Sequence, residues 1–210
     1  MQIYTGQTTG RKLEMIKKYE LGICLSSAPD SRPNRAHGSV PCFLDNGAFA
    51  CWRRGYPFQR NVFLTTLEKA YKAAINLDFI VCPDIVAGGL MSLKFSMTWA
   101  KNKLIGTPNL ALAVQDDMTP GDLDLWDVER YFTYIFVGGT TEWKWATAPT
   151  WKEYADAKKM KIHIGRCGTL DRLKYAKKLG VTSVDSTIGR AMTTGERSNS
   201  FGARFRPKWT

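Results

Sequence analysis

The sequence predicts an α/β fold, a compact (β/α)8 TIM barrel in which some helices are short or missing. Short β-like runs recur along the 210 residues, and helix-like segments separate most of them. About eight strands in such an alternation are typical of this barrel, although the usual barrel has about 250 residues. An open doubly wound sheet is the alternative architecture.

The expected strands cover residues 2–6, 21–27, 42–47, 78–85, 110–115, 134–139, 161–166 and 181–186. Apolar residues at helical spacing predict helices between several of them. One stripe consists of Leu64, Leu67, Tyr71 and Ala74, and another of Leu90, Leu93, Met97 and Ala100. A further helix is expected between Thr169, which can cap its first turn, and Gly180, which ends it.

Residues 27–41 are expected to form a loop where the barrel would otherwise have a helix. Pro29, Pro33 and Gly38 prevent a full helix in this segment. The loop is basic and carries Arg32, Arg35 and His37.

Length and composition indicate one globular domain covering residues 1–210. The chain is 44% hydrophobic and 12% aromatic. No apolar run approaches the roughly 20 residues of a membrane span, and the first residues lack the apolar core of a signal peptide. We therefore expect a cytoplasmic protein that does not enter a membrane.

Neither a metal site nor a cofactor site is indicated. The five cysteines are scattered without a CxxC pair, so a disulfide framework and a zinc site are not expected. Only two histidines are present, and the acidic residues show no metal-ligand spacing. Carboxylates are therefore expected to supply the acid, the base or the nucleophile of any reaction.

The charge favours a polyanionic partner. Thirty Lys and Arg against 19 Asp and Glu give a formal net charge of +11. Residues 190–210 form a basic and aromatic C-terminal arm that contains Arg190, Arg204 and Arg206 beside Phe201, Phe205 and Trp209. This mixture suits phosphates and bases, whereas a solvated arm packed on the barrel, and charge that serves solubility, are the alternatives.

Polar residues or glycines stand at the end of most later strands. They are Asp45, Asp84, Gln115, Gly138, Gly139 and Asp185. Any one of them could cap a loop or a helix. In a barrel all would converge on the carboxyl end, where ligands bind, so the set predicts a functional site there.

The order of several short motifs carries a resemblance to a known family. These motifs are DNGAF (45–49), CPD (82–84), AVQ (113–115), VGG (137–139), IGRCGTLDRLKYAKKLGV (164–181) and VDS (184–186). The set is similar to the tRNA-guanine transglycosylase superfamily, from about residue 44 to residue 190. That family has a (β/α)8 barrel and exchanges guanine for a 7-deazaguanine, and its DNA-acting branch inserts such bases into phage or bacterial DNA.

The resemblance implies two catalytic carboxylates. Asp185 would be the nucleophile that attacks C1′ of the sugar and forms a covalent glycosyl enzyme. Asp45 would be the general acid and base that assists departure of guanine and deprotonates the incoming base. A carboxylate nucleophile paired with a second carboxyl group suits a glycosidic carbon with oxocarbenium character.

The resemblance also implies a set of base-binding residues. Asp84 would pair with the N1 and exocyclic amine edge of the purine, while Gln115 and the Gly139 amide would hold O6. The complete expected set is Asp84, Gln115, Gly138, Gly139, Phe49 and Ile164, of which Phe49 and Ile164 would sandwich the ring.

Departures from the family pattern favour a minimal DNA-acting member. The chain lacks the Cys and His cluster that forms the structural zinc subdomain of the tRNA enzymes. Asn46 stands where the family commonly has Ser, and Ala48 where it commonly has a second Gly.

Nucleic acid would have to present an extrahelical or single-stranded base to this site. Arg53 and Arg54, which adjoin Trp52 and Tyr56, are candidates to hold the strand. Arg166, Arg190, Arg204 and Arg206 complete the expected nucleic-acid-binding set. A solvated basic surface is the alternative.

The leading hypothesis is a transglycosylase that exchanges guanine in DNA for a base such as preQ0. Its partners would be DNA and the free 7-deazaguanine base, and a homodimer or a partner subunit stays open. The alternatives are a tRNA-guanine transglycosylase, a hydrolase or deoxyribosyltransferase of free nucleosides, and a barrel that binds nucleic acid without catalysis.

Overall fold

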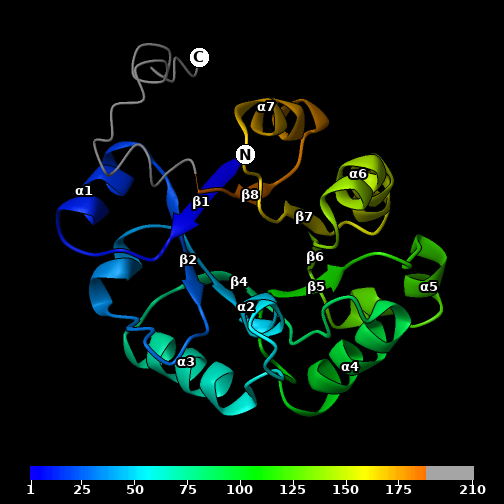
Figure 1. Ribbon diagram of the computed structural model, residues 1–210, viewed down its shortest axis with the longest axis horizontal. Helices are drawn as coiled ribbons and strands as arrows, with labels where there is room; N and C mark the ends of the chain where they lie inside the picture. Colours follow the sequence, from blue (N-terminus) through cyan, green and yellow to red (C-terminus); the bar gives the residue numbers. More distant parts are fainter. Residues whose placement is uncertain (188–210) are drawn as a thin grey trace.

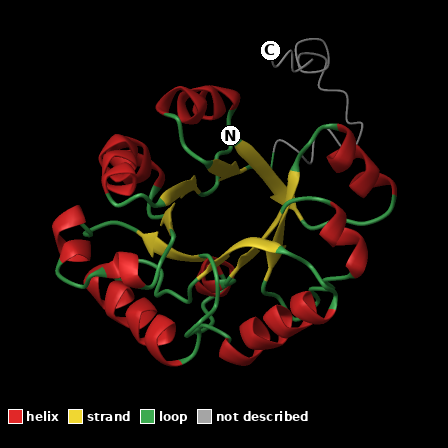
Figure 2. Ribbon diagram, turned by 180° about the vertical axis from the view of Figure 1, so that it is seen from behind, coloured by secondary structure: helices red, strands yellow, loops and turns green. Residues whose placement is uncertain are grey.

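The computed structural model of this chain describes residues 1–187. Eight parallel strands follow one another around a closed barrel, and the last pairs with the first (Figures 1 and 2). The strands are β1 (Gln2–Gly6), β2 (Gly22–Ser26), β3 (Cys42–Asp45), β4 (Leu77–Val81), β5 (Leu110–Val114), β6 (Tyr134–Val137), β7 (Lys161–Ile164) and β8 (Ser183–Asp185). The closed barrel confirms the predicted TIM barrel, and the alternative prediction of an open doubly wound sheet is wrong.

Helices surround the barrel, and several of them are short. They are α1 (Arg11–Lys18), α2 (Ala48–Arg53), α3 (Arg60–Lys72), α4 (Gly89–Asn102), α5 (Pro120–Asp124), α6 (Thr141–Ala157) and α7 (Leu170–Leu179). Between β2 and β3 lies only the 3-10 helix η1 (Arg35–Ser39), and η2 (Val128–Arg130) precedes β6. The expectation of a short or missing helix after β2 is therefore confirmed.

The predicted helix boundaries and stripes agree in part with the structure. Thr169 Oγ accepts a hydrogen bond from the Arg172 amide at 3.3 Å, and Gly180 ends α7 in the left-handed region, as expected. In α3 the buried face runs through Phe63 and Ala70, whereas the predicted Tyr71 is 49% exposed. Phe63 of α3 packs edge-on against Trp99 of α4 with ring centroids 5.9 Å apart, so this aromatic contact lies on the buried face.

Two apolar layers hold the barrel. Alternate strand residues point inward, where Phe43, Phe79 and Tyr134 stack with ring centroids 4.6 Å apart at each step. The intervening residues, such as Leu44 and Ile135, are buried in the larger outer layer with side chains of the helices. The aromatic stack fills the interior and forms a floor beneath the carboxyl end.

Helix α2 lies over one end of the barrel. Figure 1 shows it in front of the ring of strands, and Figure 2, from behind, shows a helix through the ring. Because α2 follows β3 after only two residues, it belongs to the carboxyl end. Its position brings Phe49 to the mouth of the barrel, which we use here for the carboxyl ends of the strands and their loops.

Part of the sequence prediction lies outside the described residues. Arg190, Arg204 and Arg206 of the expected C-terminal arm fall there. Within residues 1–187, no helix combines the length and the apolar character needed to cross a membrane.

Candidate active site

Three aspartates gather at the mouth of the barrel. Asp45 is the last residue of β3, Asp185 is the last residue of β8, and Asp84 follows β4. Burial raises the pKa of Asp45 to about 6, and the charges of Asp185 and Asp84 raise it as well. The Gly47 amide, 3.3 Å from Asp45 Oδ1, and Arg166 act in the opposite direction. The predicted convergence of these side chains is confirmed.

Asp84 is held by a residue that sequence analysis treated only as a departure from the family. Asn46 Nδ2 donates to Asp84 Oδ1 at 2.8 Å and to the Cys82 carbonyl at 2.7 Å, while Asn46 Oδ1 accepts from the Ala48 amide. Burial raises the pKa of Asp84 to about 6, and the Asn46 hydrogen bond partly offsets this effect. Asn46 thus links β3 to the loop after β4 and orients Asp84.

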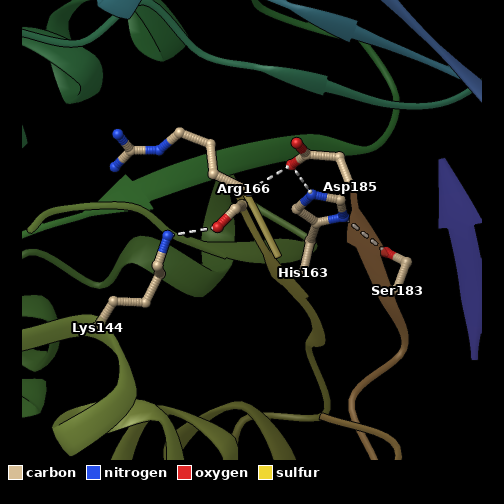
Figure 3. Close-up of polar contacts among 6 residues, drawn as sticks. Lys144, His163, Arg166, Ser183 and Asp185 are labelled. Carbon is tan, nitrogen blue, oxygen red and sulfur yellow. Dashed lines mark hydrogen bonds and ion pairs between the residues drawn. The ribbon is translucent and has the colours of Figure 1, made fainter. Parts of the chain in front are cut away.

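Asp185 is fixed through one carboxylate oxygen. Its Oδ1 accepts from His163 Nε2 at 3.1 Å and from the Arg166 amide at 3.0 Å (Figure 3). A Cβ at Gly165 would lie 2.7 Å from Phe136 Cζ, so only glycine allows this close packing beneath Asp185. Strand β7 and the turn that follows it therefore each aim one donor at the carboxylate.

His163 is a site residue that the resemblance did not suggest. It is 0% exposed, stacks on Phe136 with centroids 4.8 Å apart, and its Nδ1 lies 2.9 Å from Ser183 Oγ. Burial lowers its pKa, and Asp185 partly opposes that shift. The signal was present in the strand KIHI, where His163 alternates with two isoleucines and must face the other side of the sheet.

The same alternation corrects the prediction for Ile164. Ile164 is 0% exposed and belongs to the outer apolar layer, so it does not face Phe49 across the mouth. Instead, the guanidinium carbon of Arg166 lies 4.1 Å from the Phe49 ring centroid. The Arg166 guanidinium also donates to the Gly139 carbonyl. Arg166, not Ile164, therefore lies over the Phe49 ring from the β7 side of the mouth.

Gln115 lies beside Asp84, but its side-chain amide is hydrogen-bonded to the loop before α4 and to the first turn of α4. Its Nε2 donates to Ser92 Oγ at 2.8 Å and to the Ile85 carbonyl at 3.0 Å. Its Oε1 accepts from the Gly88 amide at 3.3 Å, and the side chain is only 3% exposed. The observed contacts shape the loop near Asp84, and an O6 contact would require one of them to break.

Gly138 and Gly139 form the turn after β6. The Gly138 amide donates to the Val114 carbonyl at 2.8 Å, so it continues the sheet. Gly139 has φ 69°, and a Cβ there would lie 2.6 Å from Asp116 Oδ2. Asp116 accepts from the Thr140 amide at 2.7 Å and thereby caps α6. Gly139 therefore lets the Asp116 carboxylate approach this turn closely.

Lys144 supports the turn that follows β7. It is 1% exposed on α6, and its ammonium group donates to the Gly165 carbonyl (Figure 3). Burial lowers the pKa of Lys144 to about 8, and Arg166 adds to this shift, whereas Asp185 opposes it. Sequence analysis missed Lys144 because nothing in the pattern of α6 separates it from surface lysines.

The expected nucleic-acid-binding residues on α2 lie at the surface. Arg53 and Arg54 are exposed, and Trp52 and Tyr56 are 53% and 59% exposed. Trp52 stacks on Phe49 with ring centroids 5.8 Å apart, so aromatic surface continues from the mouth to solvent. Within residues 1–187, no group of three or more His, Cys, Asp or Glu side chains is placed to hold a metal ion.

Comparisons with known proteins support the fold and go no further. Protein-family models give no match, and neither do curated protein sequences. The HpcH/HpaI aldolase of Desulfitobacterium hafniense DCB-2 is similar in structure, with a TM-score of 0.56, 9% identity, and coverage of 98% of this chain and 95% of that chain. A glycerophosphoryl diester phosphodiesterase of Agrobacterium tumefaciens matches with a TM-score of 0.46 and 14% identity. The match covers 80% of this chain and 60% of the phosphodiesterase chain.

Proposed function

We propose that this protein is a transglycosylase that exchanges guanine in DNA for a 7-deazaguanine base through a covalent aspartyl-glycosyl intermediate. The observation that carries the proposal is that Asp45 ends β3 and Asp185 ends β8, so both carboxyl groups lie at the carboxyl end of one closed barrel, where the charge of Asp185 raises the pKa of Asp45. Two carboxyl groups with different environments provide the nucleophile and the acid or base that glycosyl transfer needs.

In the first half-reaction, an oxygen of Asp185 bonds to C1′ as the bond from C1′ to N9 of guanine breaks. Asp45 in its protonated form gives its proton to the departing guanine. A pKa of about 6 lets Asp45 carry that proton and also lose it near neutral pH. The products are a glycosyl ester on Asp185 and free guanine.

In the second half-reaction, Asp45 takes the N9 proton of the incoming base. N9 then bonds to C1′ as the ester bond to Asp185 breaks, so Asp185 returns to its carboxylate form. Two displacements at C1′ retain the configuration of the sugar. Asp84, oriented by Asn46, is suited to accept the two donors of a guanine-like edge.

DNA as the substrate is supported by charge and by exposed aromatic residues. The net charge is +11, and Arg53 and Arg54 adjoin the exposed rings of Trp52 and Tyr56 beside the mouth. These rings can stack on bases that flank a target held out of the helix.

The proposal is tested with labelled guanine and a denaturing gel. The wild type should exchange guanine in DNA and, without an incoming base, form an adduct with DNA that migrates slowly. Asp185→Asn should form no adduct and lower exchange by at least about 1,000-fold, because the nucleophile is lost. Exchange by Asp185→Asn at the wild-type rate contradicts the proposal. Comparable turnover of mononucleosides and oligonucleotides would instead favour an enzyme of free nucleosides.

A further inference from the structure

The buried pair of His163 and Ser183 stands beneath the proposed nucleophile and has no part in the two half-reactions above. His163 contacts Asp185 through Nε2 and Ser183 through Nδ1, at 3.1 and 2.9 Å. All three side chains come from neighbouring strands, since His163 of β7 pairs in register with Ser183 of β8. The barrel itself therefore sets these distances, without a contribution from a loop.

The chemistry of the three groups determines the proton positions. A carboxylate only accepts hydrogen bonds, so His163 Nε2 must carry the hydrogen that points to Asp185 Oδ1. Burial disfavours the imidazolium form, so Nδ1 of the neutral ring is unprotonated and accepts from the Ser183 hydroxyl. Asp185 thus selects the tautomer in which His163 Nε2 is the donor, and the Ser183 hydroxyl, which can donate or accept, donates to Nδ1.

We propose that His163 is a positioning residue whose Nε2–H holds Asp185 Oδ1, so that the other oxygen, Oδ2, attacks C1′. This inference rests on the proposed glycosyl transfer. Within residues 1–187, the hydrogen bonds to the Asp185 carboxylate reach only Oδ1, from His163 and from the Arg166 amide. The contacts therefore distinguish the two oxygens before substrate arrives.

The same two donors serve the intermediate. When Oδ2 forms the ester with C1′, Oδ1 becomes the ester carbonyl oxygen and keeps both hydrogen bonds. When the ester breaks, negative charge returns to the carboxylate and the donors stabilise it, as oxyanion-hole donors do. His163 consequently lowers the barrier for Asp185 as a leaving group in the second half-reaction.

Two substitutions separate this role from packing. His163→Phe keeps an aromatic ring on Phe136 and removes the donor, whereas His163→Gln removes the ring and keeps an N–H near the position of Nε2. If His163 only fills space, His163→Phe should form and resolve the adduct faster than His163→Gln. If His163 positions Asp185, His163→Gln should form and resolve the adduct faster than His163→Phe.

The experiment measures adduct formation without incoming base, and the decay of isolated adduct on adding the base, for the full-length protein and both variants. We expect His163→Phe to slow both steps by about 10- to 100-fold and His163→Gln to slow them less than about fivefold. Thermal unfolding of each variant controls for folding, and the Phe variant should be the more stable of the two. Wild-type rates in His163→Phe, or a Gln variant as slow as Phe, overturn the inference.

A second measurement does not depend on turnover or on the folding of a His163 variant. In 15N NMR spectra of the protein, His163 should show a protonated Nε2 and an unprotonated Nδ1. Asp185→Asn should lower the pKa of His163, because Asp185 raises it while Lys144 and burial lower it. The opposite tautomer overturns the inference. Failure of the wild type to form any adduct overturns the proposed function instead, so the two failures are distinguishable.

Discussion

Each end of the barrel interior holds an aspartate hydrogen-bonded to a ring, yet the surroundings of the two pairs differ. At the amino end, the Tyr4 hydroxyl donates to Asp78 Oδ2 at 2.6 Å, and the Tyr4 ring packs edge-on against Phe43. At the carboxyl end, Asp185 accepts from His163 and lies near a second carboxylate, Asp45. The first pair is packed against aromatic rings of the barrel interior, whereas the second lies beside other carboxyl groups at the mouth.

This difference explains why the amino end is suited to stability and the carboxyl end to the proposed chemistry. A neutral phenol beside Asp78 needs no other partner, and burial together with Asp78 raises the pKa of Tyr4. At the carboxyl end, strand ends and loops bring carboxyl groups together, and burial together with the charges of Asp185 and Asp84 raises the pKa of Asp45 to about 6. Similar residue types therefore have different roles according to the end of the strand on which they lie.

The largest expected difference in exchange rate is between the Asp45→Asn and Asp78→Asn variants. Asp45→Asn should lower exchange by about 100- to 10,000-fold, because the amide neither donates nor accepts the proton. Asp78→Asn should leave exchange within about threefold and lower the free energy of unfolding by about 1 to 3 kcal/mol, since a buried phenol loses its charged acceptor. Exchange assays and urea unfolding check the pair. An Asp78→Asn variant as inactive as Asp45→Asn would break the comparison.

The pH dependence of the second half-reaction tests the carboxyl end alone. Asp45 and Asp84 have pKa values raised to about 6, so both are ionised above that pH and become protonated below it. Decay of isolated adduct with incoming base should therefore be constant above about pH 7 and fall at least about tenfold per unit below about pH 5.5. A rate unchanged between pH 7 and pH 4.5 contradicts the role of Asp45 as the base. The matched control is unfolding at each pH, which reports any loss of folded protein.

Sequence reasoning found the strand-end aspartates because period-two alternation and parallel strands leave little choice of where these side chains meet. It misplaced Ile164, although the alternation in KIHI already set His163 and Ile164 on opposite faces. The resemblance predicts Ile164 at the mouth, whereas the period-two alternation of the strand predicts His163 there. Asn46 and Lys144 were not identifiable, because each acts through a backbone carbonyl of a distant strand or loop that only the folded barrel brings near.

A smaller effect is expected at Lys144, which supports the carboxyl end without reaching its rim. Lys144→Met should slow exchange by about tenfold, because the Gly165 carbonyl loses its donor and the Arg166 amide behind Asp185 shifts. The lowered pKa of Lys144, about 8, also makes the free energy of unfolding depend on pH. Protonated Lys144 is disfavoured in the folded state, so wild-type stability relative to Lys144→Met should rise by about 2 to 3 kcal/mol as pH rises from about 7.5 to 10.5.

The control for Lys144 is another lysine of α6. Lys152 forms an ion pair with Asp156 near the surface, so Lys152→Met should change neither exchange nor the pH dependence of stability by a comparable amount. Urea unfolding of the three proteins at pH 7.5, 9 and 10.5 measures the effect. An identical pH dependence for wild type and Lys144→Met would show that Lys144 is not held in a desolvated environment.

The smallest expected effect compares exposed tryptophans at the two ends. Trp52 follows β3 at the carboxyl end, while Trp126 precedes β6 at the amino end and is 38% exposed. Trp52→Ala should weaken binding of single-stranded oligonucleotides by about fivefold or more, because a stacking surface beside the mouth is lost. Trp126→Ala should not change binding, and mononucleoside binding should be the same in both variants. Equal losses from the two substitutions would mean that nucleic acid does not distinguish the ends of the barrel.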